Sequence, residues 1–188
     1  MTTFRLRRLV ACLAYAGLAL ITVIAVPAVC FAEAAAASIL KTAFTVNFVK
    51  FTVWPDLRKG QPIQVCVSAE ATLAEAMAEA FSGQSVDGHP IHVARTIPPA
   101  GLGGCQLLYV SERDPRRFAA IMDEAAGLPL LTVSDIEGSA RRGSIIELFM
   151  EHGRLRFAIN IDALERSRLK ISSRLLSLAK TVRNSELS

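Results

Sequence analysis

The sequence predicts a single α/β domain, a mostly parallel sheet flanked by helices with an antiparallel hairpin near the C-terminus. Two observations carry this expectation. Short runs of β-branched and aliphatic residues alternate with segments of helical periodicity, which is the order typical of a covered parallel sheet. Farther on, two β-patterned runs are joined by His152-Gly153, a pair typical of a two-residue hairpin turn. The sequence contains no internal repeat and no sign of a second domain.

The N-terminus has the layout of a secretory signal peptide. Three arginines among the first eight residues precede an uncharged run, residues 9–26, and small residues follow it. We therefore expect residues 1–32 to be a signal peptide cleaved after Ala32, and residues 33–188 to form a domain exported to the periplasm. The apolar run is just long enough to span a bilayer, so an uncleaved inner-membrane anchor is the alternative.

The leader also accounts for most of the positive charge. The whole chain has 21 Lys and Arg against 17 Asp and Glu, and removing the three leader arginines leaves 18 against 17. The exported chain then has a net charge of about +1. Nucleic-acid binding requires clustered positive charge, which an exported chain of this balance is not expected to supply. We therefore expect no nucleic-acid partner.

The sequence pattern in the first part of the expected domain predicts three strands and a helix. Residues 63–68 (IQVCVS) form a short β-rich run, typical of a buried strand. Residues 71–81 carry leucine, methionine and phenylalanine at helical spacing and end at a Ser-Gly pair. Residues 90–97 and 105–110 are the second and third strands, separated by a loop rich in proline and glycine.

The next elements continue the alternation. Asp114 caps a helix that begins with Pro115 and extends to about residue 126. A fourth strand, residues 129–134, follows it, and residues 135–143 form a loop or a short helical turn.

The C-terminal part predicts the hairpin and two helices. The hairpin strands are residues 144–151 and 154–161. The pattern Asp162-x-x-Glu165 is a capping box that begins a helix. Ser172 caps a final helix with an apolar stripe that extends to Val182.

Two cysteines remain once the leader is removed, and the periplasm is oxidising. We expect Cys66 and Cys105 to pair in a structural disulfide, with a redox-active pair as the alternative. This pairing conflicts with a flavodoxin-like strand order. That order places the first and third strands side by side, yet Cys66 lies late in one predicted strand and Cys105 at the start of the other.

Few residues are candidates for catalysis. The chain has no common hydrolase, nucleotide-binding or metalloprotease motif. Its three histidines, His89, His92 and His152, are interpreted as loop or surface residues, so we expect no catalytic residue, metal or cofactor. Glu147 and Glu151 share a face of the predicted hairpin. They form either an acidic catalytic pair or, as we favour, cross-strand ion pairs with the arginines at 154 and 156.

The loop after the fourth strand is the candidate ligand or partner site. It contains Asp135, Glu137, Arg141 and Arg142. Ligands bind at strand-end loops of α/β sheets, and the arginines suit a carboxylate or phosphate group. The alternative is an ordinary exposed loop.

The stretch 41–55 (KTAFTVNFVKFTVWP) predicts a helix at the start of the domain. At helical spacing its four aromatic residues, Phe44, Phe48, Phe51 and Trp54, fall on one face. Valines and threonines occupy the opposite face, so both faces are apolar. A partner or dimer interface is expected there, formed by Val46, Val49, Lys50, Val53 and Trp54. The alternative is a purely internal core helix.

This stretch resembles the opening signature of the YfiR family, K-A-A-F-x-x-N-F-x-K-F-x-x-W-P. The segments IQVCVS, LPLLTVSDIEGSARRGSII and RLRFAINIDALERSRLKISSRLLSLAK resemble later family blocks in the same order, so the likeness extends from Leu40 to about Val182. The resemblance also implies the Cys66–Cys105 bridge. Some members have a second cysteine pair in the C-terminal half, which this chain lacks.

The resemblance implies a non-enzymatic periplasmic regulator. Such a protein represses a membrane-bound diguanylate cyclase by binding the periplasmic portion of that enzyme, and so controls cyclic-di-GMP and biofilm. An outer-membrane OmpA-like lipoprotein is implied as a second partner, and a homodimer as the assembly. The alternatives are a periplasmic small-ligand sensor module that acts on another membrane signalling protein, and a hydrolase that uses Glu147 and Glu151.

Overall fold

The structure, a computed structural model, describes residues 26–95 and 101–183. Most of the predicted signal peptide, residues 96–100 (the end of the second predicted strand and the start of the loop after it) and residues 184–188 lie outside this range. Two compact units are distinguished, Met1–Ala37 and Ser38–Ser188. Of the first unit, only a helical stretch is described. The second unit contains all the other elements.

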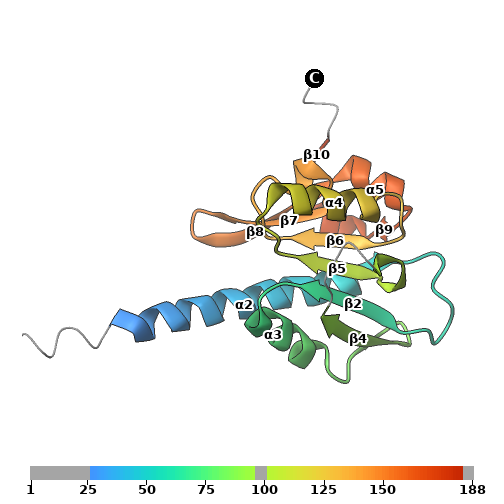
Figure 1. The fold of residues 1–188 in the computed structure, drawn as a ribbon. Coiled ribbons are helices and arrows are strands. Elements are labelled where there is room, and N and C mark those ends of the chain that lie inside the picture. The colour runs from blue at the N-terminus through green and yellow to red at the C-terminus, as the bar shows by residue number, and fades with distance from the viewer. Residues whose placement is uncertain (1–25, 96–100, 184–188) are drawn as a thin grey trace, which may run out of the picture. The chain divides into compact units, whose positions relative to one another are not determined.

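The second unit is an α/β domain built on an eight-stranded sheet (Figure 1). The helices are α2 (Val26–Lys50), α3 (Ala71–Phe81), α4 (Pro115–Ala125), α5 (Ile161–Ser167) and α6 (Ser173–Leu176), with short 3₁₀ turns η1 (Leu102–Gly104) and η2 (Ala140–Arg142). The strands are β1 (Thr52–Val53), β2 (Ile63–Ser68), β3 (Ser85–Val86), β4 (His89–Arg95), β5 (Leu107–Val110), β6 (Leu131–Ser134), β7 (Ile146–Glu151), β8 (Arg154–Asn160), β9 (Lys170–Ile171) and β10 (Lys180–Val182).

The strand order is β10-β8-β7-β6-β5-β2-β4-β3. Strands β4, β2, β5, β6 and β7 are parallel neighbours, and their order is the flavodoxin-like 2-1-3-4-5. Strand β8 returns antiparallel to β7, and β10 lies parallel to β8 at the sheet edge. The predicted mostly parallel sheet with a C-terminal antiparallel pair is therefore confirmed.

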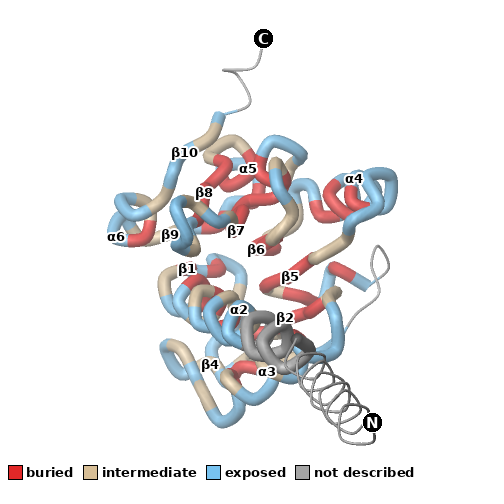
Figure 2. Tube along the Cα trace, turned by 90° about the vertical axis from the view of Figure 1, so that its left-hand side faces the viewer, coloured by how far each residue is buried: buried red, intermediate tan, exposed pale blue. Residues whose placement is uncertain are grey.

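Each face of the sheet has its own apolar core, because successive side chains of a strand point to opposite faces. One cluster combines α2 and α3 with side chains such as Val65, Leu107 and Tyr109. The other combines α4 with Cys66 and Leu108. Strands β5 and β6 are buried at every position, as expected for strands covered on both faces (Figure 2).

Local signals placed several elements correctly. The helix α3 has the predicted bounds, and Asp114 caps α4 by accepting the backbone N–H of Arg116 at 2.9 Å. The hairpin turns at His152 and Gly153, which have φ angles of 50° and 73°. Positive φ at both central residues is the conformation that hairpin turns of this type require.

The predicted helix over residues 41–54 is too long. Helix α2 ends at Lys50, and Thr52–Val53 instead form the strand β1, antiparallel to β9. Phe44 and Phe48 still share a face and both contact the Phe157 ring, with centroids 6.0 and 5.2 Å apart. The reason for the early stop is the distant partner strand, which offers backbone hydrogen bonds to β-branched residues.

The C-terminal prediction also needs correction. The final helix, α6, has only four residues, and Lys180–Val182 form the strand β10 rather than a helical stripe. Leu178 is 65% exposed. The cap of α5 is Asn160, which accepts the N–H of Ala163 at 2.9 Å, and not Asp162.

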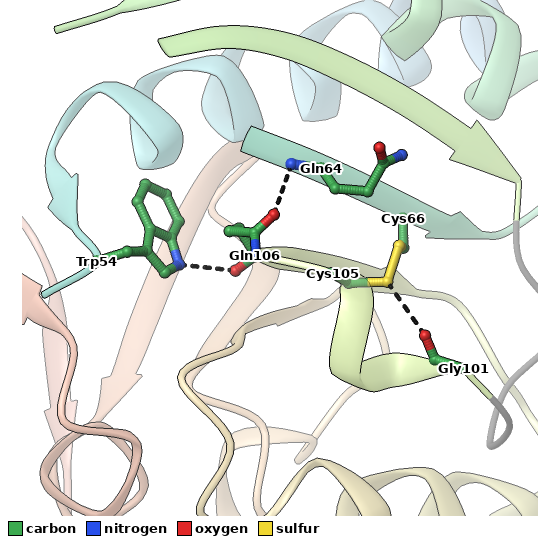
Figure 3. The surroundings of a disulfide bond; sticks show 6 residues. All are labelled: Trp54, Gln64, Cys66, Gly101, Cys105 and Gln106. Carbon is green, nitrogen blue, oxygen red and sulfur yellow. Dashed lines mark hydrogen bonds between the residues drawn. A yellow bond between two sulfur atoms is a disulfide. The ribbon is translucent and has the colours of Figure 1, made fainter. Parts of the chain in front are cut away.

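The disulfide between Cys66 and Cys105 is present, with the Cα atoms 5.9 Å apart (Figure 3). The parallel pairing of β2 with β5 is nevertheless regular, and Cys66 lies opposite Leu108. The two observations are compatible because β5 begins only at Leu107. Cys105 precedes the strand, at the end of the turn η1, where it reaches the same face as Cys66.

Candidate functional site

Glu147 holds the loop that joins β6 to β7. Its side chain is buried, and its carboxylate accepts the backbone N–H groups of Gly138 at 2.8 Å and Ala140 at 2.9 Å. Both carboxylate oxygens are thereby occupied, as a buried charge requires. The favoured cross-strand ion pair therefore occurs only at Glu151, whose Oε2 lies 3.8 Å from Arg156 Nε. For Glu147 that interpretation is wrong, because this side chain orders the loop.

A salt bridge ties α2 to the same loop. Lys41 Nζ lies 2.5 Å from Asp135 Oδ2, and the two side chains are 28% and 11% exposed. The hydroxyl of Tyr109 is buried near Asp135. Burial, and secondly the Asp135 carboxylate, raise the pKa of Tyr109 far above its ordinary value of 10.0. The Tyr109 hydroxyl and Asp135 Oδ1 have no hydrogen bond of good geometry within the described residues. This junction is therefore a small polar site inside an apolar core.

A hollow of about 630 Å³ opens between this loop and the last strands of the sheet. The loop contributes Asp135, Glu137, Gly138 and Arg141, and the sheet contributes residues 147–151 of β7, Ala158 of β8, and Lys180 and Val182 of β10. The strand register explains this lining, since Glu147 lies opposite Ala158 and Ala158 opposite Lys180 on one face. The volume is in the usual range of small-molecule sites, and the lining mixes apolar surface with charges of both signs.

Three of the four predicted loop residues line the hollow, and Arg142 does not. Its guanidinium lies 4.7 Å from the centre of the Phe118 ring and donates to the carbonyl of Glu137 at 2.9 Å. Arg142 therefore stabilises the loop against α4. The sequence reasoning missed Lys180 and Val182, because it assigned them to a helix. No local signal marks their strand, whose partner β8 is distant in the chain.

The predicted interface residues separate into buried and exposed positions. Val49 and Trp54 are buried in the core, and Val46 is partly buried. The Trp54 indole Nε1–H donates to the carbonyl of Gln106 at 2.9 Å, which joins the end of β1 to the start of β5 (Figure 3). Lys50 is exposed, and Val53 is 55% exposed on the β1–β9 pair. Contact with a partner at this face would therefore rest on Lys50 and Val53.

Two of the three histidines belong to β4 and the third lies in the hairpin turn. His89 Nδ1 is 2.8 Å from the carbonyl oxygen of Gln61, His92 is exposed on β4, and His152 occupies the hairpin turn. Within residues 26–95 and 101–183, no group of three or more His, Cys, Asp or Glu side chains is placed to hold a metal ion. The helices in these ranges also include none that is both long and apolar enough to span a membrane.

The chain is similar to known proteins in sequence and in fold. The sequence model of a family described as YfiR/HmsC-like matches residues 38–180. Among solved structures, the fold is similar to a crystal structure titled as a conserved domain protein from Vibrio cholerae O1 biovar El Tor strain N16961, with a TM-score of 0.53 and 12% sequence identity. The match covers 74% of this chain and 59% of that one. At that identity the second likeness concerns the fold alone.

Proposed function

The chain belongs to the YfiR/HmsC-like family, and on that premise we propose that it represses a membrane-bound diguanylate cyclase by binding the enzyme's periplasmic portion. In this role it is a non-enzymatic regulator that lowers cyclic-di-GMP and restrains biofilm formation. The observation that carries the proposal is the family match over residues 38–180, nearly the whole domain expected after signal-peptide cleavage.

The geometry of the carboxylates favours regulation over hydrolysis. A pair of acids would need free oxygens facing a bound substrate. Both carboxylate oxygens of Glu147 accept hydrogen bonds from the loop backbone, and Glu151 forms an ion pair with Arg156. Glu147 therefore orders the loop backbone and is not free for an acid–base reaction.

Repression by binding requires a difference in affinity between two states of the cyclase. A regulator shifts an equilibrium only as far as it binds the inactive state more tightly than the active one. Lys50 and the exposed Val53 offer a cation beside an apolar contact at the β1–β9 pair. We place the contact with the cyclase there, and with it the surface that an OmpA-like outer-membrane lipoprotein would cover when it sequesters the regulator. The same apolar contact would support a homodimer.

The first experiment is deletion of the gene with measurement of cyclic-di-GMP and biofilm. Both rise if the protein is a repressor, and no change in a strain that normally expresses the protein contradicts the proposal. Complementation with Val53→Glu then tests the surface. This variant should fail to repress while Ala119→Glu, at an exposed position of α4, represses normally.

A second candidate function rests on the hollow beside the β6–β7 loop. Its volume of about 630 Å³ is typical of small-molecule sites, and two cations, Arg141 and Lys180, line it beside four carboxylates. The domain would then be a periplasmic sensor module for a small ligand whose anionic group meets these cations. Thermal-shift screening of the exported domain tests this. A compound that stabilises the wild type but not Arg141→Ala supports a sensor. Equal stabilisation of both proteins contradicts a site at Arg141.

A further inference from the structure

The segment 166–183 (RSRLKISSRLLSLAKTVR) concentrates positive charge. It contains six Lys and Arg and no Asp or Glu. The whole chain has a net charge of +4, so the other 170 residues together carry −2. The net charge of residues 33–188, which is close to zero, does not reveal this cluster of positive residues. The expectation that the chain lacks clustered positive charge is therefore wrong for this segment.

The fold divides the run among short elements rather than one long helix. The basic surface consists of Lys170 on β9, Arg174 in α6, Lys180 on β10 and Arg183 just after β10. Arg166 and Arg168 lie at the end of α5, and all six cations are exposed. Figure 2 shows β9, α6 and β10 on the same side of the domain. Among the described residues, only Arg183 has a carboxylate within salt-bridge distance, that of Asp162 at 3.7 Å.

One large apolar side chain lies within this surface. Leu178 is 65% exposed and follows α6, between Arg174 and Lys180 in the chain. Cations around a protruding apolar side chain are the pattern of proteins that lie on lipid headgroups. The charges meet lipid phosphates while the apolar group enters the boundary with the acyl chains.

We propose that this surface, residues 170–183, docks the domain onto an anionic lipid bilayer. Leu178 and the spread of cations over three short elements favour lipid phosphates over a single acidic peptide, which would need a groove to hold it. Docking would confine the domain to the membrane plane and raise its encounter rate with any membrane protein. The proposal goes beyond the proposed function and does not depend on which membrane protein is bound.

Vesicle co-sedimentation of the exported chain, residues 33–188, tests the proposal. The chain should bind vesicles of phosphatidylethanolamine and phosphatidylglycerol, bind neutral phosphatidylcholine vesicles at least tenfold more weakly, and dissociate as salt is raised. Each cation near the surface strengthens binding by about fivefold. The triple variant Lys170→Gln, Arg174→Gln, Lys180→Gln should therefore bind at least tenfold more weakly. Leu178→Ser should weaken binding several-fold.

The matched control removes three exposed cations elsewhere, with Arg58→Gln, Lys59→Gln and Arg95→Gln, and should bind like the wild type. Circular dichroism and thermal melting establish that both triple variants are folded. Equal binding to neutral and anionic vesicles, or equal losses in both triple variants, overturns the proposal. So does capture of the cyclase's periplasmic portion that depends on the basic surface while vesicles are not bound. Because the vesicle assay contains no cyclase, its failure leaves the proposed repression untouched.

Discussion

Lys41 and Asp135 form a salt bridge, with Nζ and Oδ2 2.5 Å apart, that links the N-terminal helix of the domain to the loop after β6. Both side chains are mostly buried, so removing one leaves the charge of the other unpaired in a poorly hydrated environment. Lys41→Ala should lower the free energy of unfolding by about 1–3 kcal/mol in urea titrations. Arg117→Ala breaks a more exposed pair with Glu112 and is the control, expected to cost less than about 1 kcal/mol. Equal losses in the two variants would contradict this ranking.

The disulfide between Cys66 and Cys105 closes a loop with a sequence separation of 39 residues. Restricting the unfolded chain to that extent contributes about 4 kcal/mol in the chain-entropy treatment. Cys66→Ser should therefore melt well below the oxidised wild type. Reductant should lower the melting temperature of the wild type and leave that of Cys66→Ser unchanged. Identical melting of the wild type with and without reductant would refute a stabilising bridge.

Trp54 combines core packing with one hydrogen bond to the Gln106 carbonyl, and the two contributions can be separated. Trp54→Phe keeps most of the packing and should cost about 1 kcal/mol, because the carbonyl retains its bond from the backbone N–H of Leu131. Trp54→Ala leaves a cavity and should cost about 3–5 kcal/mol. Denaturant titration compares them, and similar costs for the two variants would count against a packing role.

Tyr109 is the only tyrosine of residues 33–188, because the other, Tyr15, lies in the predicted signal peptide. Its pKa is raised in the folded state by burial, and the unfolded chain ionises near the ordinary value of 10.0. The folded state therefore keeps a proton that the unfolded state loses, so its stability falls as the pH rises above about 10. Phenolate absorbance should show no step near pH 10 in the native protein and a normal step in urea. A normal step in the native protein would contradict burial of the hydroxyl.

Glu147 and Glu151 lie on the same strand face and should respond differently to substitution. Glu147→Gln loses a charged acceptor from two backbone N–H bonds and should destabilise the domain by about 1–3 kcal/mol. Glu151→Gln affects a surface pair and should cost less than about 1 kcal/mol. Urea unfolding measures both free energies. A larger loss of stability in Glu151→Gln than in Glu147→Gln would contradict the structural role of Glu147.

Part of the candidate site was predictable from the sequence. Asp135, Glu137 and Arg141 were predicted because they lie in a loop that follows a buried strand of an α/β sheet. These three residues line the hollow. The partners that close it, Lys180 and Val182, were not predictable. Their segment has leucines at near-helical spacing, and only pairing with β8 makes it a strand.

The sequence by itself determined the features that depend on neighbouring residues. These are the strand at 63–68, the helix at 71–81, the Asp114 cap and the His152-Gly153 turn, because capping, periodicity and turn geometry act within a few residues. Only the tertiary structure decided that Thr52–Val53 would leave α2 to pair with β9, and that Glu147 would bind the loop backbone. A short strand takes most of its stability from a partner strand, and a buried carboxylate from the donors around it. Those partners are brought close only when the chain folds.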